Sequence, residues 1–425
     1  MLKTKFFYLS VLLLGFLSIA NSFYWIITTY HALPFLDAWE MPYLYQKYQL
    51  GELTFYDLMV NHNQHRLFIP RLFYLVDYVF FNGSQIFLIS CIILLHLLFA
   101  LFFTRIFVFP LINDNKHRGL IFILISTVML SPIQLANLAM GFNIQYILSF
   151  LSALIAFTLA NQLPFYFSLR YIFGLLLSAL VGLLSLANGL LILPIVVFIL
   201  IKNKQSKQSI LFFSFFSVLF IMGYFTHYQS AGEQSYLQYF LNHPLDFIYY
   251  ISVLSANIFQ FFGSKIEAII GFLILSLASF LLLFWLFKAT KNQVNILFLM
   301  LLYILISLAM IAVSRLEIGV YFANASRYTT ATLILFLVLL FIPAYLFKIK
   351  QNITPFLCFL IMISFLGSNK AKQDFQQRLL IKQQITLEQQ QGILSNKTLG
   401  KSFPNPELIH PLIDYLYQQK LSAFR

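Results

Sequence analysis

Residues 293–313 read QVNILFLMLLYILISLAMIAV and contain no Asp, Glu, Lys or Arg. A helix of about 20 apolar residues is long enough to cross the hydrocarbon core of a bilayer. Ten further apolar runs bring the predicted spans to eleven, at 6–30, 85–109, 119–138, 142–160, 171–187, 189–201, 209–225, 266–287, 293–313, 328–347 and 353–368. The runs 171–187 and 189–201 are separated only by Asn188-Gly189, and the second of them is short.

The composition of the whole chain agrees with a membrane location. Of its 425 residues, 60% are hydrophobic and only 10% are charged, whereas soluble domains carry about a quarter charged residues. So few charges cannot cover an apolar core in water, and we therefore predict an all-α polytopic membrane protein that faces lipid. The net charge is +13, but the basic residues punctuate the apolar runs, so we expect no nucleic-acid partner.

Basic residues fall between alternate spans, as the positive-inside rule describes. With the N-terminus in the cytoplasm, the inner segments contain Lys3, Lys5, Lys116, Arg118, Arg170, Lys202, Lys204, Lys207, Lys288, Lys291, Lys348 and Lys350. Of the 14 acidic residues, only Asp114 falls on the inner side. The pattern predicts a cytoplasmic N-terminus and an external C-terminus.

Three predicted outer regions are long enough to carry chemistry, namely 31–84, 225–265 and 370–425. We expect a transmembrane domain at 1–369 and a helical outer tail at 370–425, with helices at 370–391 and 406–421 on either side of Pro404 and Pro406. Within the first outer loop, segment 67–81 is apolar but short. We interpret it as an interfacial or re-entrant helix, because a span there would break the charge alternation.

The first outer loop concentrates polar residues just beyond the first span. Asp37 would lie at the membrane surface, where a carboxylate can accept the proton of an attacking hydroxyl. Trp39 and Glu40 follow it, and we take Glu40 as a second candidate catalytic acid and Trp39 as a substrate-binding residue. The alternative is that Asp37 is a solvated loop acid or the N-cap of the helix that follows.

The same loop contains His62, His65, Arg66 and Arg71. On a helix, the two histidines would share one face, and with Asp37 they could hold a divalent metal; the alternative is a hydrogen-bonded pair at the membrane interface. The two arginines are candidate phosphate ligands, because a guanidinium matches phosphate oxygens bidentately. They could instead extend to lipid headgroups.

Further candidates lie at the outer ends of later spans. Gln134 and Asn137 follow the third span, where amides can bind a sugar or satisfy a helix end, and Asn188-Gly189 fits a tight turn that tolerates positive φ. The last outer loop supplies the candidate phosphate and substrate ligands Arg315, Arg327 and Tyr328. An Arg at the start of a span is costly without an anionic partner, which would be a phosphate, a lipid headgroup or Glu317.

Together these residues resemble the GT-C superfamily of membrane glycosyltransferases, and within or near it a group of bacterial polytopic membrane proteins. The resemblance rests on Asp37-x-Trp39, His62-x-x-His65-Arg66 before Pro70-Arg71, Pro132-x-Gln134-x-x-Asn137 with Gly141-Phe142, Ala187-Asn188-Gly189, and Ser326-Arg327-Tyr328. It extends over the whole chain, although no motif identifies a sugar.

The resemblance implies a sugar donor linked to polyprenyl phosphate or diphosphate, transfer with inversion, and a bacterial inner membrane as the location. It implies that Asp37 is the acid of the first outer loop, and an envelope glycan, lipid or protein would be the acceptor. The family often has two closely spaced acids, and here Asp37-x-x-Glu40 departs from that spacing.

Two other functions remain open from the sequence. A polymerase or ligase of lipid-linked oligosaccharides would share this topology and these lipid carriers. A transporter or flippase would instead keep polar residues at mid-membrane and show internal repeats. In this chain the polar residues gather at the outer ends of the predicted spans, and no long repeat is visible.

Overall fold

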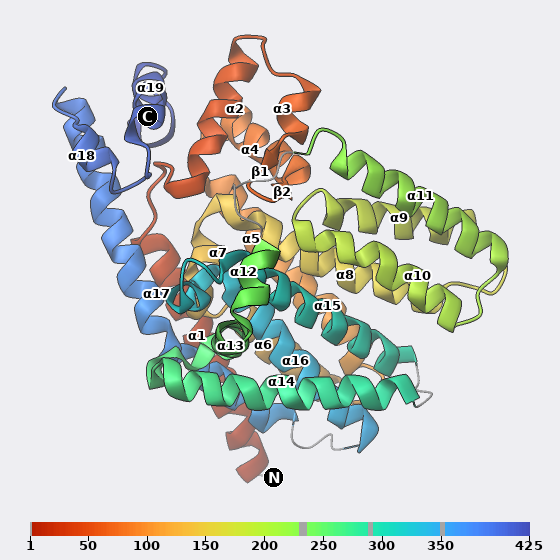
Figure 1. Cartoon of the computed structure of the whole chain (residues 1–425). Coiled ribbons are helices and arrows are strands. Elements are labelled where there is room, and N and C mark those ends of the chain that lie inside the picture. Colours follow the sequence, from red (N-terminus) through yellow and green to blue (C-terminus); the bar gives the residue numbers. More distant parts are fainter. Residues whose placement is uncertain (1, 229–235, 288–291, 349–352) are drawn as a thin grey trace.

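A computed structural model describes residues 2–228, 236–287, 292–348 and 353–425, and in these the chain is largely helical (Figure 1). Lys288, Lys291 and Lys350 of the predicted charge pattern lie outside the described residues.

Nine helices among the described residues are long and apolar enough to cross a membrane. They are built from α1 (Leu2–Thr28), α5 (Ile86–Phe103) with η2 (Thr104–Val108), α6 (Asn115–Met129), α8 (Ile144–Gln162), α11 (Lys207–Phe225), α14 (Ser264–Phe287), α15 (Asn292–Arg315), α16 (Thr329–Leu346) and α17 (Ile353–Gln390). The two runs beside Asn188-Gly189 form the shorter helices α9 (Leu169–Leu183) and α10 (Ile192–Lys202), the latter preceded by η5 (Ala187–Leu191). All eleven predicted runs are helical, which confirms the all-α membrane class. Eleven crossings remain a prediction.

Either count is odd, so a chain that crosses nine or eleven times has its termini on opposite sides. Figure 1 shows the N-terminus at one end of the bundle and the C-terminus at the other, beside the elements of the first outer loop. Which of these ends faces the cytoplasm stays a prediction from the charge pattern.

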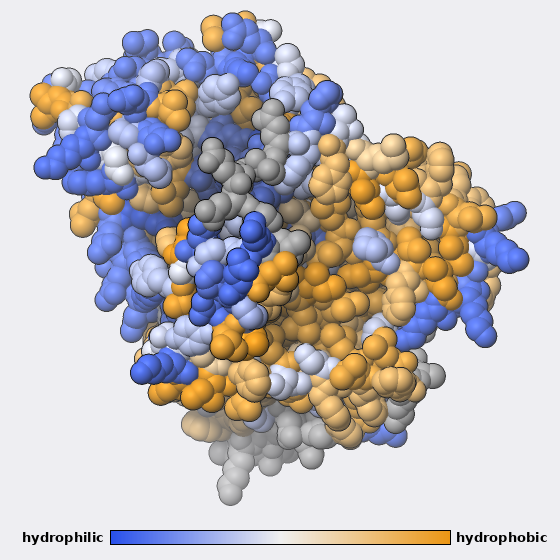
Figure 2. All heavy atoms as spheres, in the orientation of Figure 1, coloured by the Kyte–Doolittle hydropathy of each residue, from blue (hydrophilic) through white to orange (hydrophobic). Residues whose placement is uncertain are grey.

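Large apolar side chains cover much of the helical surface. Phe16 on α1, Phe215 on α11 and Phe280 on α14 are each at least 60% exposed. In Figure 2 apolar residues form the broad surface beside and below the centre, whereas hydrophilic residues gather at the end that carries the first loop and the C-terminus. Such an apolar surface is stable only in contact with lipid.

The first outer loop folds into η1 (Leu36–Trp39), α2 (Glu40–Gln49), α3 (Phe55–Met59), β1 (Asn61–His62), β2 (His65–Arg66) and α4 (Phe68–Phe81). Helix α4 coincides with the short helix predicted at 67–81. Its 14 residues extend about 21 Å, less than the roughly 30 Å of a hydrocarbon core. Its Arg71, Tyr74 and Asp77 are buried against the rest of the protein, so the helix has a packed face despite its short length.

The remaining elements are shorter, and they either connect the long helices or follow α17 in the C-terminal tail. They are η3 (Pro132–Gln134), α7 (Leu135–Ala139), η4 (Gly141–Asn143), α12 (Tyr236–Asn242), α13 (Pro244–Ser255), η6 (Asn257–Phe262), η7 (Val320–Asn324), η8 (Ser326–Tyr328), α18 (Asn396–Leu399), α19 (Pro406–Gln418) and η10 (Ser422–Phe424).

The predicted boundary at residue 370 falls inside one continuous helix. Helix α17 has 38 residues and extends about 57 Å, so it can cross a bilayer and continue well beyond it. Helix α19 matches the second predicted tail helix. The tail packs on the first loop, because Ile385 and Ile413 share a hydrophobic cluster with Leu33 and Trp39.

Hydrogen bonds fasten this tail to the segment that leads into Asp37. The Leu36 backbone N–H donates to the Ser402 carbonyl at 2.9 Å, and the Ser422 hydroxyl donates to the Ala32 carbonyl at 2.7 Å. Leu36 itself has a φ of 51°, a left-handed conformation that is unusual for a residue with a side chain. The C-terminal tail therefore helps to fix the backbone that presents Asp37.

Gly189 was expected to permit a turn with positive φ, but the structure shows that it permits close packing. It lies in η5 and is not among the described residues with positive φ. A Cβ at this position would stand 2.0 Å from the Gly182 carbonyl oxygen, which is impossible without moving the backbone. Glycine is required here because α9 and η5 approach each other closely.

Candidate functional site

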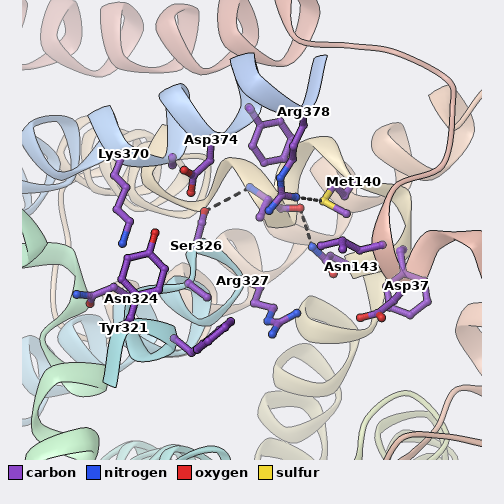
Figure 3. A pocket seen from close by; sticks show the side chains of 17 residues that line it. Asp37, Met140, Asn143, Tyr321, Asn324, Ser326, Arg327, Lys370, Asp374 and Arg378 are labelled. Carbon is purple, nitrogen blue, oxygen red and sulfur yellow. Dashed lines mark hydrogen bonds between the residues drawn. The ribbon is translucent and has the colours of Figure 1, made fainter. Parts of the chain in front are cut away.

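Asp37 lies in η1, at the end of the bundle that carries the first outer loop. Its side chain is 41% exposed, and it borders a cavity of about 190 Å³ between the first loop, η8 and α17. Figure 3 shows the Asp37 carboxylate and the Arg327 guanidinium turned toward each other across this cavity. The closest ion-pair partner of Asp37 among the described residues is His62, whose Nε2 is 3.8 Å from Oδ1. Asp37 therefore lies beside an imidazole and remains accessible to solvent.

Glu40, one helical turn further on, is engaged on both of its oxygens. Its Oε1 lies 2.5 Å from Nε and Nη2 of the buried Arg71, and its Oε2 lies 2.8 Å from Nδ1 of His62. Arg71 also donates to the backbone carbonyls of Leu58 and Val60. An acid held in this way orients its neighbours and is a poor proton acceptor for a substrate.

These contacts determine the protonation of Glu40 and His62. Burial alone would raise the pKa of the Glu40 carboxyl, but His62 and Arg71 outweigh burial and hold that pKa below its ordinary value. Burial would likewise lower the pKa of the His62 imidazole, but Glu40 and then Asp37 reverse this and raise it. His62 is therefore favoured as an imidazolium between the carboxylates of Glu40 and Asp37.

The raised pKa of His62 predicts how stability changes with pH. A group whose pKa is raised by folding stabilises the protein fully below its unfolded pKa of about 6.5, and this contribution disappears as pH rises through the folded pKa. The melting temperature of the wild type should therefore exceed that of His62→Gln most at pH 5.5–6.5. The difference should shrink steadily toward pH 9, as measured by thermal unfolding in detergent. A difference that grows with pH would contradict the imidazolium assignment.

The two histidines lie in a β-hairpin and not on a helix, which corrects the expected geometry. Asn63 has a φ of 51° and permits a tight turn, so His62 and His65 pair directly across β1 and β2. His65 turns toward η5, where its Nδ1 accepts a 3.4 Å hydrogen bond from the Ala187 N–H. Burial, together with the charges of His62 and two nearby arginines, lowers the pKa of His65 to about 3.

The hairpin therefore points the two imidazoles at different neighbours. Among the described residues, no three His, Cys, Asp or Glu side chains gather closely enough to hold a metal ion. The metal site expected from His62, His65 and Asp37 stays a prediction, which this geometry does not support.

Arg66 has a structural role in place of the expected phosphate contact. It is 3% exposed, and its guanidinium donates to the carbonyls of Met59, Tyr224 and Thr226. Arg66 thereby joins the hairpin to the end of α11. Arg71 likewise donates to Glu40 and to two backbone carbonyls. Neither arginine of the first loop therefore has a pair of N–H donors available for bidentate binding of a phosphate.

Arg327 and Arg315 are the arginines placed to meet a ligand. Both border a second cavity of about 410 Å³, and Arg327 also borders the cavity of Asp37. Neither arginine has a carboxylate within 4 Å among the described residues. The ion pair between Arg327 and Glu317, one of the alternatives that the sequence left open, is therefore not formed. The Arg327 guanidinium lies 5.2 Å from the Tyr328 ring centroid, and its buried Nε has no hydrogen-bond partner in the described part of the chain.

The second cavity is mostly apolar away from the arginines. Phe150, Leu186, Met310 and Val313 supply part of its wall, and the predicted site residues His65, Asn188 and Tyr328 border it as well. Asn188 is held by Ser149, whose hydroxyl donates to its Oδ1 at 2.9 Å. The cavity combines an apolar wall with two cations at one edge, which suits an amphiphilic anion.

Three other predicted ligands are buried in the protein and border neither cavity. The side-chain carbonyl of Gln134 accepts a hydrogen bond from the Thr330 hydroxyl, and the side-chain amide of Asn137 donates to the backbone carbonyl of Arg327 at 2.8 Å. Both residues therefore fix the segment that carries Arg327. Trp39 is 3% exposed and packs in the hydrophobic cluster beneath the first loop. These residues support the site without lining it.

No family model, curated protein or solved structure matches this chain. Its function must therefore be argued from the two cavities and the side chains that border them.

Sequence reasoning missed three charged residues that border the cavity of Asp37. Lys370, Asp374 and Arg378 all come from α17, at intervals of four residues (Figure 3). Residues four apart lie on one face of a helix. The spacing was visible within the predicted helix at 370–391, and it is the signal that could have identified this face.

Proposed function

We propose that the protein is a membrane glycosyltransferase that moves a sugar from a polyprenyl-phosphate or -diphosphate donor to a cell-envelope acceptor at the outer face of the membrane. The observation that carries this proposal is the position of Arg327. It borders both the apolar cavity and the cavity of Asp37, which we call the polar cavity because five charged side chains border it. Across the polar cavity Arg327 faces Asp37. A cation between a lipid-compatible cavity and a carboxylate fits the phosphate of a lipid-linked sugar.

In this proposal the donor lipid occupies the larger cavity. Its first isoprenoid units would contact the apolar wall, while Arg315 and Arg327 would bind the phosphate through charge-assisted hydrogen bonds. The sugar would then extend past Arg327 toward Asp37, and the acceptor would enter through the cavity that Asp37 borders. The Tyr328 ring makes a cation–π contact with the Arg327 guanidinium.

The reaction needs one base and one anion-stabilising cation. The acceptor hydroxyl oxygen attacks the anomeric carbon in line with the bond to phosphate, and Asp37 takes the hydroxyl proton as the new C–O bond forms. The old bond to the phosphate oxygen breaks, and the phosphate leaves with the electron pair and gains stabilisation from Arg327. Attack opposite the leaving group inverts the anomeric centre. Glu40 would act indirectly, by holding His62 beside Asp37.

The apolar cavity gives a test that does not depend on catalysis. Ala309→Trp would fill part of the wall of this cavity, so binding of polyprenyl phosphate should weaken at least ~10-fold, which corresponds to about 1.4 kcal/mol. Native mass spectrometry of the purified protein with added polyprenyl phosphate measures this. Phe280→Trp, on the exposed surface of α14, is the matched control and should bind the lipid as the wild type does.

A wild type that fails to bind polyprenyl phosphate would contradict the donor assignment. Equal binding by the wild type and Ala309→Trp would place the lipid elsewhere. Mass analysis of envelope glycans from a deletion strain would then identify the missing sugar and its acceptor, and separate single-sugar transfer from the polymerase or ligase alternative.

A further inference from the structure

The cavity of Asp37 contains charged side chains that the proposed transfer does not require. Lys370, Asp374 and Arg378 extend from α17 into the region between the first loop and η7 (Figure 3). They border the polar cavity and do not border the apolar donor cavity. These residues are therefore placed to contact whatever molecule approaches Asp37.

Arg378 lacks a partner suited to its charge. In the described part of the chain, its Nη1 donates a hydrogen bond to the Met140 sulfur at 2.8 Å, and a thioether is a weak acceptor. The guanidinium is otherwise covered by aromatic rings, 5.2 Å from the Phe35 centroid and 5.0 Å from that of Phe375. Because Arg has five N–H donors, most of its hydrogen-bonding capacity is available to a ligand.

Lys370, two turns earlier on the helix, also has its charged group over an aromatic ring. Its Nζ lies 4.1 Å from the centroid of the Tyr321 ring, and no carboxylate lies within 4 Å of it among the residues described. The ion pairs of the described chain involve Lys47, His62 and Arg71 as cations. Neither Lys370 nor Arg378 is neutralised by a direct contact.

Cations outnumber carboxylates in the lining of this cavity. The lining has three cations, Arg327, Lys370 and Arg378, and two carboxylates, Asp37 and Asp374. In the proposed reaction the donor phosphate contacts Arg327, whereas Lys370 and Arg378 have no part in binding the donor. An anionic acceptor would give these two cations a partner in a partly desolvated site, which a neutral acceptor would not do.

We propose that this cavity is the acceptor subsite and that it selects a saccharide carrying an anionic group, either a carboxylate or a phosphate, bound by Arg378 and Lys370. Arg378 is the nearer anchor to the reacting hydroxyl, because its guanidinium stacks on Phe35, two residues before Asp37. Asp374 would accept a hydrogen bond from a neighbouring hydroxyl of the same saccharide. The inference rests on the proposed function, since it names the acceptor class of that reaction.

The size of the cavity suits one sugar unit better than an extended surface contact. Its volume of about 190 Å³ is less than half of the roughly 410 Å³ of the apolar cavity. The acidic unit of the acceptor would therefore enter, while the rest of the molecule remained outside.

The test compares three small probes that differ in charge. Methyl glucuronide carries a carboxylate, glucose 6-phosphate carries a phosphate, and methyl glucoside is neutral. Saturation-transfer NMR on the full chain in nanodiscs measures the affinity of each. In the wild type, at least one acidic probe should bind about tenfold or more tightly than methyl glucoside, and the stronger one identifies the anionic group. Arg378→Gln should abolish this preference, and Lys370→Gln should reduce it.

Arg105→Gln is the matched control, because Arg105 also stacks on an aromatic ring but borders a separate cavity. It should keep the full preference for acidic probes. The inference is overturned if the wild type binds neutral and acidic probes equally, or if Arg105→Gln loses the preference as Arg378→Gln does. Should Arg378→Gln not fold, Lys370→Gln decides the test, since an unchanged preference in that variant contradicts the proposed subsite.

Binding of polyprenyl phosphate is measured on the same samples to separate the two proposals. Lipid binding that persists in a protein without acidic preference overturns the acceptor subsite and leaves the proposed transferase intact. Acidic preference in a protein that does not bind polyprenyl phosphate would leave the subsite in place and contradict the donor.

Discussion

Replacing Asp37 by Asn should lower the rate of sugar transfer by at least ~10²-fold, the usual share of general base catalysis. The change is nearly isosteric and removes the basicity of the side chain. Asp37 suits this role because it is accessible, borders the polar cavity, and makes only a 3.8 Å contact with His62 as its ion pair. Sugar transfer from a polyprenyl-phosphate donor in proteoliposomes, at matched protein levels, is the measurement.

The matched control is Glu52→Gln, which removes an exposed carboxylate from the same loop and should leave the transfer rate within about twofold. Asp37→Asn should still bind polyprenyl phosphate, because that binding depends on the arginines and the apolar cavity. Full activity in Asp37→Asn would leave Glu40 as the remaining acid. That result would contradict the assignment of Asp37 as the base, because Arg71 and His62 already occupy both oxygens of Glu40 and transfer would then proceed without a free carboxylate base.

Arg327 should show the second large effect. Removing a preorganised charge that stabilises a leaving group costs about 10²–10³-fold in rate, so Arg327→Ala should lose that much transfer. Arg327→Lys keeps the charge but loses the planar fork, and it should recover only part of the lost rate. The readout is the same transfer assay, with kcat and KM determined separately, because stabilisation of the leaving phosphate acts mainly on kcat.

Arg105→Lys provides the control for this exchange. Arg105 and Arg327 both place a guanidinium over an aromatic ring, at 4.9 Å from Phe109 and 5.2 Å from Tyr328. Only Arg327 borders the cavities of the proposed site. Arg105→Lys should therefore transfer sugar at the wild-type rate. If Arg327→Lys does the same, Arg327 is an anchor for lipid headgroups and not a ligand of the leaving phosphate.

The helical framework could be predicted from the sequence because lipid imposes a strict rule. Every backbone group in the hydrocarbon core must be satisfied internally, so long apolar runs can only be helices. The run 293–313 and the ten others are accordingly helical. The short helix α4 could be predicted too, since charge alternation excluded a crossing there.

The first loop was harder to predict because its geometry depends on distant contacts. The spacing of His62 and His65 fits a helix, but the left-handed Asn63 turns it into a hairpin. Two of the three carbonyls that accept from Arg66, those of Tyr224 and Thr226, are about 160 residues away. Contacts of this kind leave no local pattern, so a buried structural arginine resembled a phosphate ligand.

The charged face of α17 could be predicted from the sequence, but its position beside Asp37 could not. The intervals between Lys370, Asp374 and Arg378 predict one charged helical face, yet only the fold shows that this face borders the cavity of Asp37. The packing of 391–425 on the first loop depends on isolated contacts such as the bond from Leu36 to Ser402.

The most direct test of the account follows the fate of the donor. The wild type and Asp37→Asn would be reconstituted with polyprenyl-phosphate-linked sugars and with the envelope glycan fraction of a deletion strain as acceptor. Mass spectrometry of both lipid and glycan should show free polyprenyl phosphate and a glycan heavier by one sugar with the wild type, and neither with Asp37→Asn. A donor that remains intact, or that crosses to the other leaflet unchanged, would contradict a glycosyltransferase and favour a transporter.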